Sequence, residues 1–245
     1  MNTQATRQLA ELILQSNNTV FFGGAGVSTE SGIPDFRSDQ GLYKEKSRIP
    51  PEEIISHSFF IRNPEMFYDF YKHKMVYPGA KPNPAHLALA RLEAMGKMQA
   101  VITQNIDGLH QAAGSKNMLE LHGSVHRNYC MRCRKSFTLH EVLKAPGVPA
   151  CACGGMVKPD VVLYEEALDS AITSRAIRAI EKSELLIIGG TSLTVYPAAS
   201  FVSLCSGKIA IINKSATMMD QAADVLITMP IGEAFAEVME VIEGD

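Results

Sequence analysis

The chain has 245 residues, which is enough for one large α/β domain with a smaller module, and its core needs no disulfide bonds. Hydrophobic residues make up 46% and charged residues 20%, proportions that exclude a disordered or fibrous protein. The formal net charge of -3 argues against a nucleic-acid scaffold and leaves open an acidic groove for lysine-rich peptides.

No basic segment at the start leads into an unbroken apolar run, and no later stretch is apolar over a bilayer-spanning length. We therefore expect a cytoplasmic protein without membrane contact.

The first predicted element is an amphipathic helix, because Ala5, Leu9, Leu12 and Ile13 recur at helical spacing. A short apolar run from Thr19 to Phe22 follows it and indicates a buried strand.

Later segments repeat this alternation. Asn83 and Pro84 predict the N-cap and first turn of a helix through Met95, which Gly96 ends. Further strands are predicted at 100–103, 185–188, 209–212 and 225–227, with another helix opening at Pro197. Apolar strands separated by helices are typical of a doubly wound parallel sheet, so the fold class is α/β and Rossmann-like.

Two segments interrupt the alternation. Residues 38–77 are rich in Phe, Tyr and charges, which suggests a helical insertion, and residues 123–156 contain two cysteine pairs. We expect these two to form a smaller domain beside a Rossmann-like domain made of 1–37, 78–122 and 157–245.

A glycine-rich turn follows the first strand at Gly23-Gly24-Ala25-Gly26-Val27-Ser28-Thr29. Such a turn lets backbone N–H groups approach a pyrophosphate at a helix N-terminus. It lacks the third glycine of the dinucleotide fingerprint, so a plain tight turn remains an alternative. Asp35, Phe36 and Arg37 then place an acid, an aromatic ring and a guanidinium in one loop, which favours a phosphate and sugar site.

The run from Gly24 to Arg37 resembles the signature of the sirtuins, the NAD-dependent protein deacylases. Other pieces match in family order: Thr103-Gln104-Asn105-Ile106-Asp107, Leu121-His122-Gly123, Lys158-Pro159-Asp160-Val161-Val162, Gly190-Thr191-Ser192 and Ile212-Asn213. The resemblance covers nearly the whole chain and implies one NAD molecule consumed per acyl group removed.

Gln104, Asn105 and Asp107 follow a predicted strand at the end where open α/β sheets bind ligands, and His122 follows another apolar run, 118–121. A lone histidine is most often a surface or structural residue. With these neighbours, we expect His122 to be a general base, since imidazole titrates near neutral pH.

The resemblance also implies roles. In the family, the acyl oxygen of a modified lysine attacks the ribose carbon that carries nicotinamide, and the histidine then activates a ribose hydroxyl; Asn105 assists catalysis. NAD contacts are implied for Gly24, Ala25, Gly26, Ser28, Thr29, Asp35, Phe36, Arg37, Gln104, Asn105, Ile106, Asp107, His122, Gly190, Thr191, Ser192, Asn213 and Ile231. Substrate contacts are implied for Phe36, His122, Val162, Tyr68 and Tyr71.

Two cysteine pairs, Cys130/Cys133 and Cys151/Cys153, have a spacing close to that of a zinc ribbon. Four thiolates fill a tetrahedral zinc shell, so we predict one structural zinc ion. A redox pair or two disulfides are the alternative, which a cytoplasmic location disfavours. Cys205 is expected in the core.

The sequence departs from the family pattern at three places. Gly23 replaces a common threonine, and Tyr164-Glu165-Glu166 replaces Phe-Gly-Glu. Tyr68-x-x-Tyr71 lacks the arginine of sirtuins that prefer acidic acyl groups, so we expect acetyl or longer uncharged acyl groups.

The expected partners are proteins or peptides with acetyl-lysine, bound by a monomer that contacts no nucleic acid. Two other functions fit parts of the pattern: an NAD-dependent mono-ADP-ribosyltransferase, and a non-enzymatic module that binds NAD or carries a zinc ribbon.

Overall fold

The fold comes from a computed structural model, which describes residues 3–35, 41 and 49–244. Within this part of the chain, six strands form one parallel sheet in the order β3-β2-β1-β7-β8-β9. Their bounds are Thr19–Gly23 (β1), Ala100–Thr103 (β2), Met118–Glu120 (β3), Leu185–Gly189 (β7), Lys208–Ile212 (β8) and Val225–Ile227 (β9). This is the Rossmann strand order, which confirms the predicted fold class.

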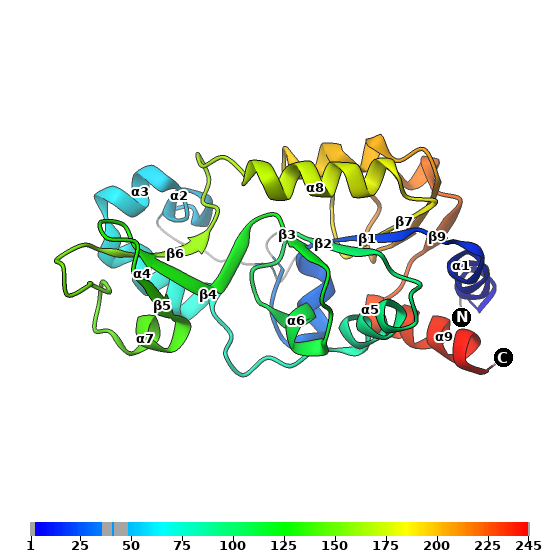
Figure 1. The fold of residues 1–245 in the computed structure, drawn as a ribbon, viewed down its shortest axis with the longest axis horizontal. Helices are drawn as coiled ribbons and strands as arrows, with labels where there is room; N and C mark the ends of the chain where they lie inside the picture. The colour runs from blue at the N-terminus through cyan, green and yellow to red at the C-terminus, as the bar shows by residue number, and fades with distance from the viewer. Residues whose placement is uncertain (1–2, 36–40, 42–48, 245) are drawn as a thin grey trace.

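Helices cover both faces of this sheet (Figure 1). On one face lie α1 (Thr3–Gln15), α5 (Pro84–Ala94), α6 (Leu109–Ala113) and α9 (Ile231–Gly244); on the other lie α8 (Ser170–Glu181) and the 3-10 segment η4 (Ala198–Leu204). Strand β1 shows why both faces need a cover. Phe21 packs into the core on the face covered by α1, α5 and α9, whereas Val20 and Phe22 pack into the core on the face covered by α8 and η4. Successive side chains of a strand point to opposite faces.

The helix predicted from Asn83 begins as expected. The Asn83 side chain accepts hydrogen bonds from the N–H groups of Ala85 and His86, and Pro84 occupies the first turn. Met95 is the C-cap and Gly96 follows with φ +73°. The segment after Pro197 differs from the expectation, since it forms the 3-10 segment η4 and not an α-helix.

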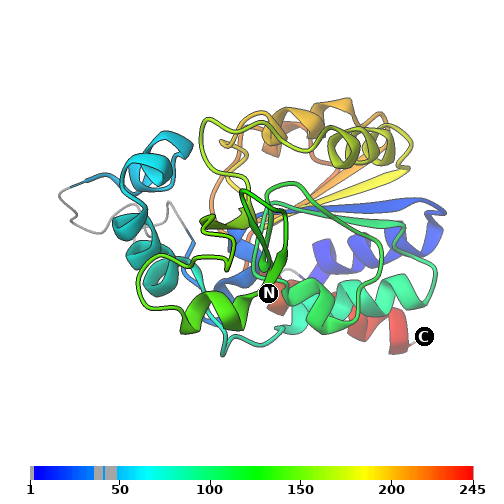
Figure 2. The ribbon, with the colours of Figure 1, turned by 60° about the vertical axis from the view of Figure 1, so that its left-hand side comes forward.

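A second, antiparallel sheet has the order β5-β4-β6. Its strands are β4 (Gly123–Cys130), β5 (Ser136–Thr138) and β6 (Val157–Val161), with α7 (Leu139–Lys144) beside them. Beside it lie the short helices α2 (Pro51–Ile54), α3 (His57–Arg62), α4 (Pro64–Phe70) and the π-helical turn η3 (Tyr71–Met75), as Figure 2 shows.

The helical insertion and the cysteine segment share one core, which includes Phe60, Phe67, Val125, Leu139 and Val157. One segment pairs differently from the expectation. Residues 157–161, expected in the Rossmann-like domain, instead pair with β4 at the edge of the second sheet. Periodicity could not reveal this pairing, because Val157–Val161 contains Lys, Pro and Asp and has no apolar run that predicts a strand.

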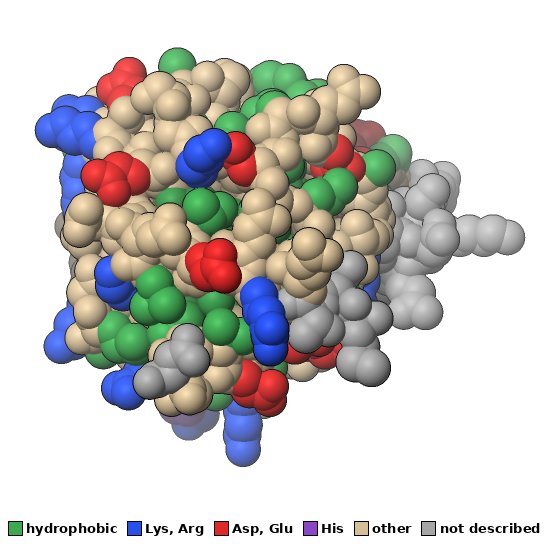
Figure 3. Space-filling view, turned by 90° about the vertical axis from the view of Figure 1, so that its right-hand side faces the viewer, with side chains coloured by type: hydrophobic (Ala, Val, Ile, Leu, Met, Phe, Trp, Pro, Cys, Tyr) green, Lys and Arg blue, Asp and Glu red, His purple; other side chains and the backbone are tan. Residues whose placement is uncertain are grey.

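None of the described helices is long and apolar enough to cross a bilayer. Figure 3 shows the end of the molecule that carries α1 and α9, where basic and acidic side chains are interspersed in the described part of the surface.

Candidate active site

A cavity of about 500 Å³ lies at the carboxyl ends of the parallel strands, next to the loops that follow β1 and β7. The strand order reverses between these two strands, and open α/β sheets bind ligands at such a switch point. Most residues expected to contact NAD or substrate line it: Gly24, Ala25, Gly26, Ser28, Asp35, Gln104, Asn105, Ile106, Asp107, His122, Val162, Gly190, Thr191, Ser192 and Asn213.

The glycine-rich turn packs directly against the end of β7. The Gly26 N–H donates to the Gly190 carbonyl at 2.8 Å, and a Cβ on Gly26 would lie 2.8 Å from the Gly190 Cα. Gly190 itself has φ +57°, and a Cβ there would lie 2.3 Å from the Val27 nitrogen. Glycine at both positions lets the two loops touch and form one wall of the cavity.

The turn also differs from the expectation in two respects. It continues into the 3-10 segment η1 (Ala25–Ser31) and not into an α-helix. In addition, two of the N–H groups expected to face a pyrophosphate already have partners. The Gly24 N–H donates to the Gly189 carbonyl and the Gly26 N–H to the Gly190 carbonyl.

Ser28 connects two of the predicted polar residues. Its hydroxyl donates to Asp107 Oδ2 at 2.6 Å, and it accepts a hydrogen bond from Asn105 Nδ2 at 3.1 Å. The second Asp107 oxygen accepts the Leu109 N–H at 2.9 Å, which caps the start of α6. The three polar side chains are thus held in fixed orientations at the edge of the cavity, although Ser28 is 79 residues from Asp107 in the sequence.

His122 lies between β3 and β4, where the chain crosses from the large sheet to the small one. Its Nδ1 donates to the Gln104 carbonyl at 3.0 Å, because a carbonyl oxygen can only accept. Burial lowers the pKa of His122 below its ordinary value of 6.5, and the Gln104 hydrogen bond opposes this only in part. The ring is therefore neutral at pH 7, with Nε2 as its basic nitrogen.

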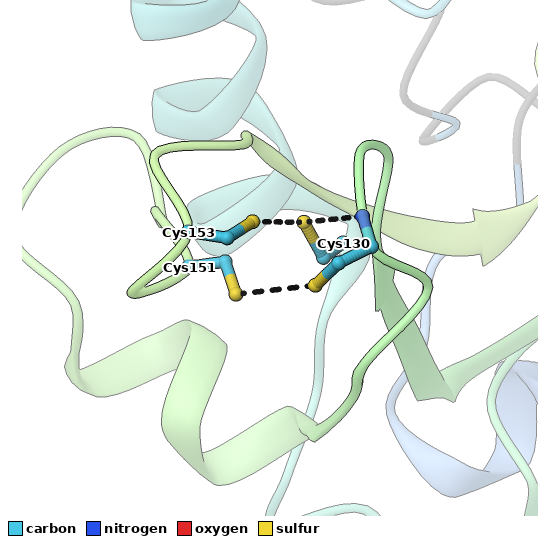
Figure 4. A group of neighbouring side chains, drawn as sticks. Cys130, Cys151 and Cys153 are labelled. Atoms are coloured by element: carbon cyan, nitrogen blue, oxygen red, sulfur yellow. Dashed lines mark hydrogen bonds between the residues drawn. The ribbon is translucent and has the colours of Figure 1, made fainter.

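A second candidate centre consists of four cysteines in the small domain. Their sulfur atoms all lie within 4.8 Å of one another, with Cys130 to Cys153 at 3.5 Å and Cys133 to Cys151 at 3.7 Å. Figure 4 shows Cys151 and Cys153 on one loop, with the Cys153 sulfur facing that of Cys130 on a second segment. A disulfide needs a sulfur–sulfur distance of about 2.05 Å, so the thiols are unbonded.

These spacings suit zinc. A tetrahedral ion with Zn–S bonds of about 2.3 Å has sulfur atoms about 3.8 Å apart. The Cys133 and Arg132 N–H groups donate to Cys130 Sγ at 3.5 and 3.4 Å and lower the pKa of that thiol to about 6, which favours its thiolate. Despite the Gly155 N–H, the neighbouring thiols raise the pKa of Cys153 to about 11. The four residues form a site for one structural zinc ion, with no position left for a reacting water.

Comparison with known proteins assigns the chain to a family. The model of the Sir2 family matches residues 24–197, which includes the glycine-rich turn, His122 and all four paired cysteines. The chain belongs to the Sir2 family. Sirtuins of known structure superpose on nearly all of it: a Sir2 with a deacetylated p53 peptide and 3′-O-acetyl ADP-ribose has a TM-score of 0.88 at 40% identity, covering 95% of this chain and 96% of that one.

A further sirtuin structure, a Sir2 with p53 peptide and NAD+, has a TM-score of 0.86 at 40% identity and covers 97% of each chain. Among curated proteins, an NAD-dependent protein deacetylase from Clostridium perfringens is 58% identical over 238 residues, 95% of this chain and 98% of that protein. The NAD-dependent protein deacetylase of Thermotoga maritima is 41% identical over 243 residues.

Two residues expected at the substrate lie elsewhere in this sirtuin. Tyr68 and Tyr71 are both 0% exposed, and they pack in the core of the small domain rather than in the lining of the cavity. The Tyr68 hydroxyl donates to the Val157 carbonyl, and burial raises the pKa of both tyrosines. The family resemblance implied substrate contacts for both, but they lie on α4 and η3 and face β6.

Two residues expected at the cofactor have other surroundings, and two more are not described. Thr29 does not line the cavity, and its hydroxyl donates to the Gly26 carbonyl at 3.0 Å. Ile231 is 3% exposed and packs in the core beneath α9, where it approaches Gly189. Phe36 and Arg37 lie outside the described residues.

Sequence reasoning missed several residues of the cavity wall. Lys74 and Tyr77, near the end of the helical insertion, line it, as do Ile55, Leu163 and Tyr196. The aromatic and charged composition of 38–77 was a signal for an insertion, but it did not distinguish the residues that face the cavity from Tyr68 and Tyr71. Lys74 also adds a cation that the expected acyl preference did not consider, so that preference stays a prediction.

Proposed function

We infer that this sirtuin is an NAD-dependent protein lysine deacetylase that releases nicotinamide, O-acetyl-ADP-ribose and deacetylated lysine. One observation carries the inference: a neutral histidine, oriented through Nδ1, lines the same cavity as the Asn105–Ser28–Asp107 network at the sheet's switch point. The relatives named as NAD-dependent protein deacetylases match over nearly their full length, which supports the same activity here.

The cavity suits a nucleotide with a peptide beside it. Its volume is within the range of about 300–1,000 Å³ typical of small-molecule sites. We propose that the loops at 24–28 and 190–192 hold the phosphates and that Asn213 binds the adenosine ribose. NAD supplies a ribose carbon whose bond to nicotinamide breaks and a ribose hydroxyl that accepts the acetyl group.

His122 acts as the general base in this proposal. Its Nδ1–H is held by the Gln104 carbonyl, so Nε2 is the nitrogen that takes a proton from a ribose hydroxyl and later returns it. The low pKa of His122 keeps it ready to accept a proton at neutral pH, and the Gln104 carbonyl stabilises the ring when it becomes charged.

The polar network positions the sugar and the amide. Asp107 is held by Ser28 and by the Leu109 N–H, so it presents a fixed acceptor edge to the nicotinamide carboxamide. Asn105 is oriented by the same serine and orders the ribose side. Such preorganised groups lower the cost of orienting the reactants.

The acetyl-lysine peptide is proposed to bind beside Val162. The Val162 N–H donates to the His122 carbonyl at 3.0 Å, which fixes this residue next to the general base. Main-chain recognition of an extended peptide tolerates many sequences, so we propose acetylated proteins as a class.

We also propose that the protein acts as a monomer in the cytoplasm, a compartment in which four thiols remain reduced and free to bind metal. Size-exclusion chromatography with light scattering tests the first part.

The deciding experiment incubates the purified protein with NAD and an acetyl-lysine peptide and measures released nicotinamide. Mass spectrometry then identifies the second product. O-acetyl-ADP-ribose together with deacetylated peptide supports the proposal. ADP-ribose attached to protein would indicate the transferase alternative, and no nicotinamide release at all would leave only a binding module.

A further inference from the structure

The loop after β6 contains a residue in an unusual backbone conformation. Glu165 has φ +74°, the left-handed region that side chains other than glycine rarely adopt. It stands where the sirtuin pattern has glycine, which adopts this conformation without steric cost. The backbone conformation is therefore present in this chain without the residue that makes it easy.

The Glu165 side chain compensates with two hydrogen bonds to a single residue. Its carboxylate accepts the Ser58 N–H at 2.8 Å and the Ser58 hydroxyl at 3.0 Å. Ser58 lies in the first turn of α3, 107 residues away in the sequence. Glycine at this position cannot make either contact.

The adjacent backbone is joined to the same helix. The His57 N–H donates to the Tyr164 carbonyl at 2.9 Å, and the Tyr164 N–H donates to the Ile55 carbonyl at 3.1 Å. These bonds make a short parallel bridge between Ser56 and Tyr164. The hydrogen bonds from Ser58 to the Glu165 carboxylate extend this bridge by one residue on each segment.

Glu166 anchors the other side of the loop. Its carboxylate accepts the Leu163 N–H at 2.9 Å and pairs with His57 Nδ1 at 2.8 Å and with Lys158 Nζ at 3.1 Å. Two consecutive carboxylates thus connect the loop to the start of α3, and Glu165 is the one that the family pattern lacks.

The connected segment is the cavity wall next to His122. Val162, Leu163, Tyr164 and Glu165 all line the cavity. We propose that Glu165 is a positioning residue, which holds the peptide-accepting segment Val162–Tyr164 against α3 before the substrate arrives; this rests on the deacetylase function proposed above. A segment that is already ordered loses less conformational freedom when a peptide binds, so the effect belongs to peptide affinity.

The variant Glu165→Gly separates this role from general stability. Glycine accepts φ +74° but removes both hydrogen bonds to Ser58. We expect the KM for an acetyl-lysine peptide to rise about fivefold, with kcat and the KM for NAD within about twofold of wild type. The melting temperature should fall little, because relief of the backbone strain offsets the lost contacts.

Ser58→Ala provides the matched variant. It removes the hydroxyl but leaves the Ser58 N–H and the Glu165 backbone intact, so a smaller rise in the peptide KM is expected. In the double variant the two effects should not add, because both remove the same contact. If Glu165→Gly does not fold, Ser58→Ala alone carries the test. Glu65→Gln, an exposed carboxylate on α4, controls for the loss of one negative charge and should leave the peptide KM unchanged.

Direct binding of the acetyl-lysine peptide, measured by calorimetry without NAD, gives a readout independent of turnover. A weaker Kd for Glu165→Gly, in step with its KM, supports the inference. An unchanged Kd and KM in an active wild-type background overturns it, as does a parallel fall of kcat and melting temperature, which would mean a purely structural role. A wild-type protein without turnover would instead contradict the proposed function.

Discussion

His122 Nδ1 donates a 3.0 Å hydrogen bond to the main-chain carbonyl of Gln104, 18 residues earlier in the chain. The bond joins the second residue after β3 to the first residue after β2, so the pairing of two neighbouring strands brings the imidazole to the carbonyl that orients it. A carbonyl fixes the ring and its tautomer without adding a charge. This arrangement leaves Nε2 to do the chemistry.

Replacement of this imidazole should remove turnover while leaving the nucleotide site formed. We expect His122→Ala to lower kcat for deacetylation by about 10²- to 10⁴-fold, the usual contribution of a general base. Its Kd for NAD should stay within about threefold of wild type, because most of the lining is unchanged. Product formation and calorimetry measure the two quantities. His73→Ala, at an exposed site on η3, is the control; normal turnover by His122→Ala would remove the base assignment.

The pH dependence of kcat/KM should follow the lowered pKa of His122. Burial disfavours the charged ring, so the active neutral form persists below pH 6.5, the ordinary histidine pKa. As the pH falls, the midpoint of the activity loss should lie below pH 6.5, so activity at pH 6.5 should still exceed half of its plateau. A pH–rate profile on a short acetyl peptide measures this. An acid limb centred above pH 6.5 would contradict the burial effect.

The four cysteines should bind about one zinc ion per chain, measured by elemental analysis of the purified protein. Cys151→Ser should lose the metal and destabilise the small domain, because structural zinc contributes to folding free energy directly. Cys205→Ser is a matched control, since Cys205 lies outside the cluster, and it should keep the full zinc content. A folded, active protein without metal would refute the zinc site.

Two buried histidines should make the fold sensitive to acid. His86 and His110 are 0% and 1% exposed, with ring centroids 4.7 Å apart, and burial lowers the pKa of His86 to about 4 and of His110 to about 3. Between about pH 6.5 and pH 4, these two histidines bind protons in the unfolded chain but not in the folded chain. The free energy of unfolding therefore decreases as the pH falls through this range. Each histidine then costs up to about 1.4 kcal/mol per pH unit.

Urea unfolding between pH 7 and pH 5 measures this loss for wild type and His110→Leu. The variant should lose stability less steeply, by about 1.4 kcal/mol per pH unit, because it lacks one of the two groups. His140→Gln, at an exposed position of α7, should leave the slope unchanged. Equal slopes for wild type and His110→Leu would show that this ring does not drive the acid loss.

The sequence alone was sufficient for most strands of the large domain and for two of its helices, α1 and α5. Apolar runs predicted β2 and β9 at the residues where they occur, and β1, β7 and β8 to within one residue, since strands buried on both faces consist of continuous apolar side chains. The capping signals at Asn83 and Gly96 also predicted the ends of α5, because a helix cap is local and its hydrogen bonds reach only a few residues.

Most residues that the motifs placed at the cofactor do line the cavity, because the carboxyl ends of parallel strands converge on one edge whatever the details of packing. The spacing of the cysteines was equally informative, since four ligands of one ion must meet. The sequence did not predict which polar groups bind one another within the cavity. It placed Ser28 near a ligand, but it did not predict the hydrogen bonds of Ser28 to Asp107 and Asn105.

Only the tertiary structure decided the contacts between distant segments. The family resemblance implied substrate contacts for Tyr68 and Tyr71, but the sequence could not say that they pack against β6, so this pair forms part of a core. The same holds for β6, which pairs with β4, and for Glu165, whose backbone strain and Ser58 partner appear only when residues 107 apart are brought together. Periodicity reports which side chains avoid water, whereas the partner of each buried or strained group depends on how the folded segments pack.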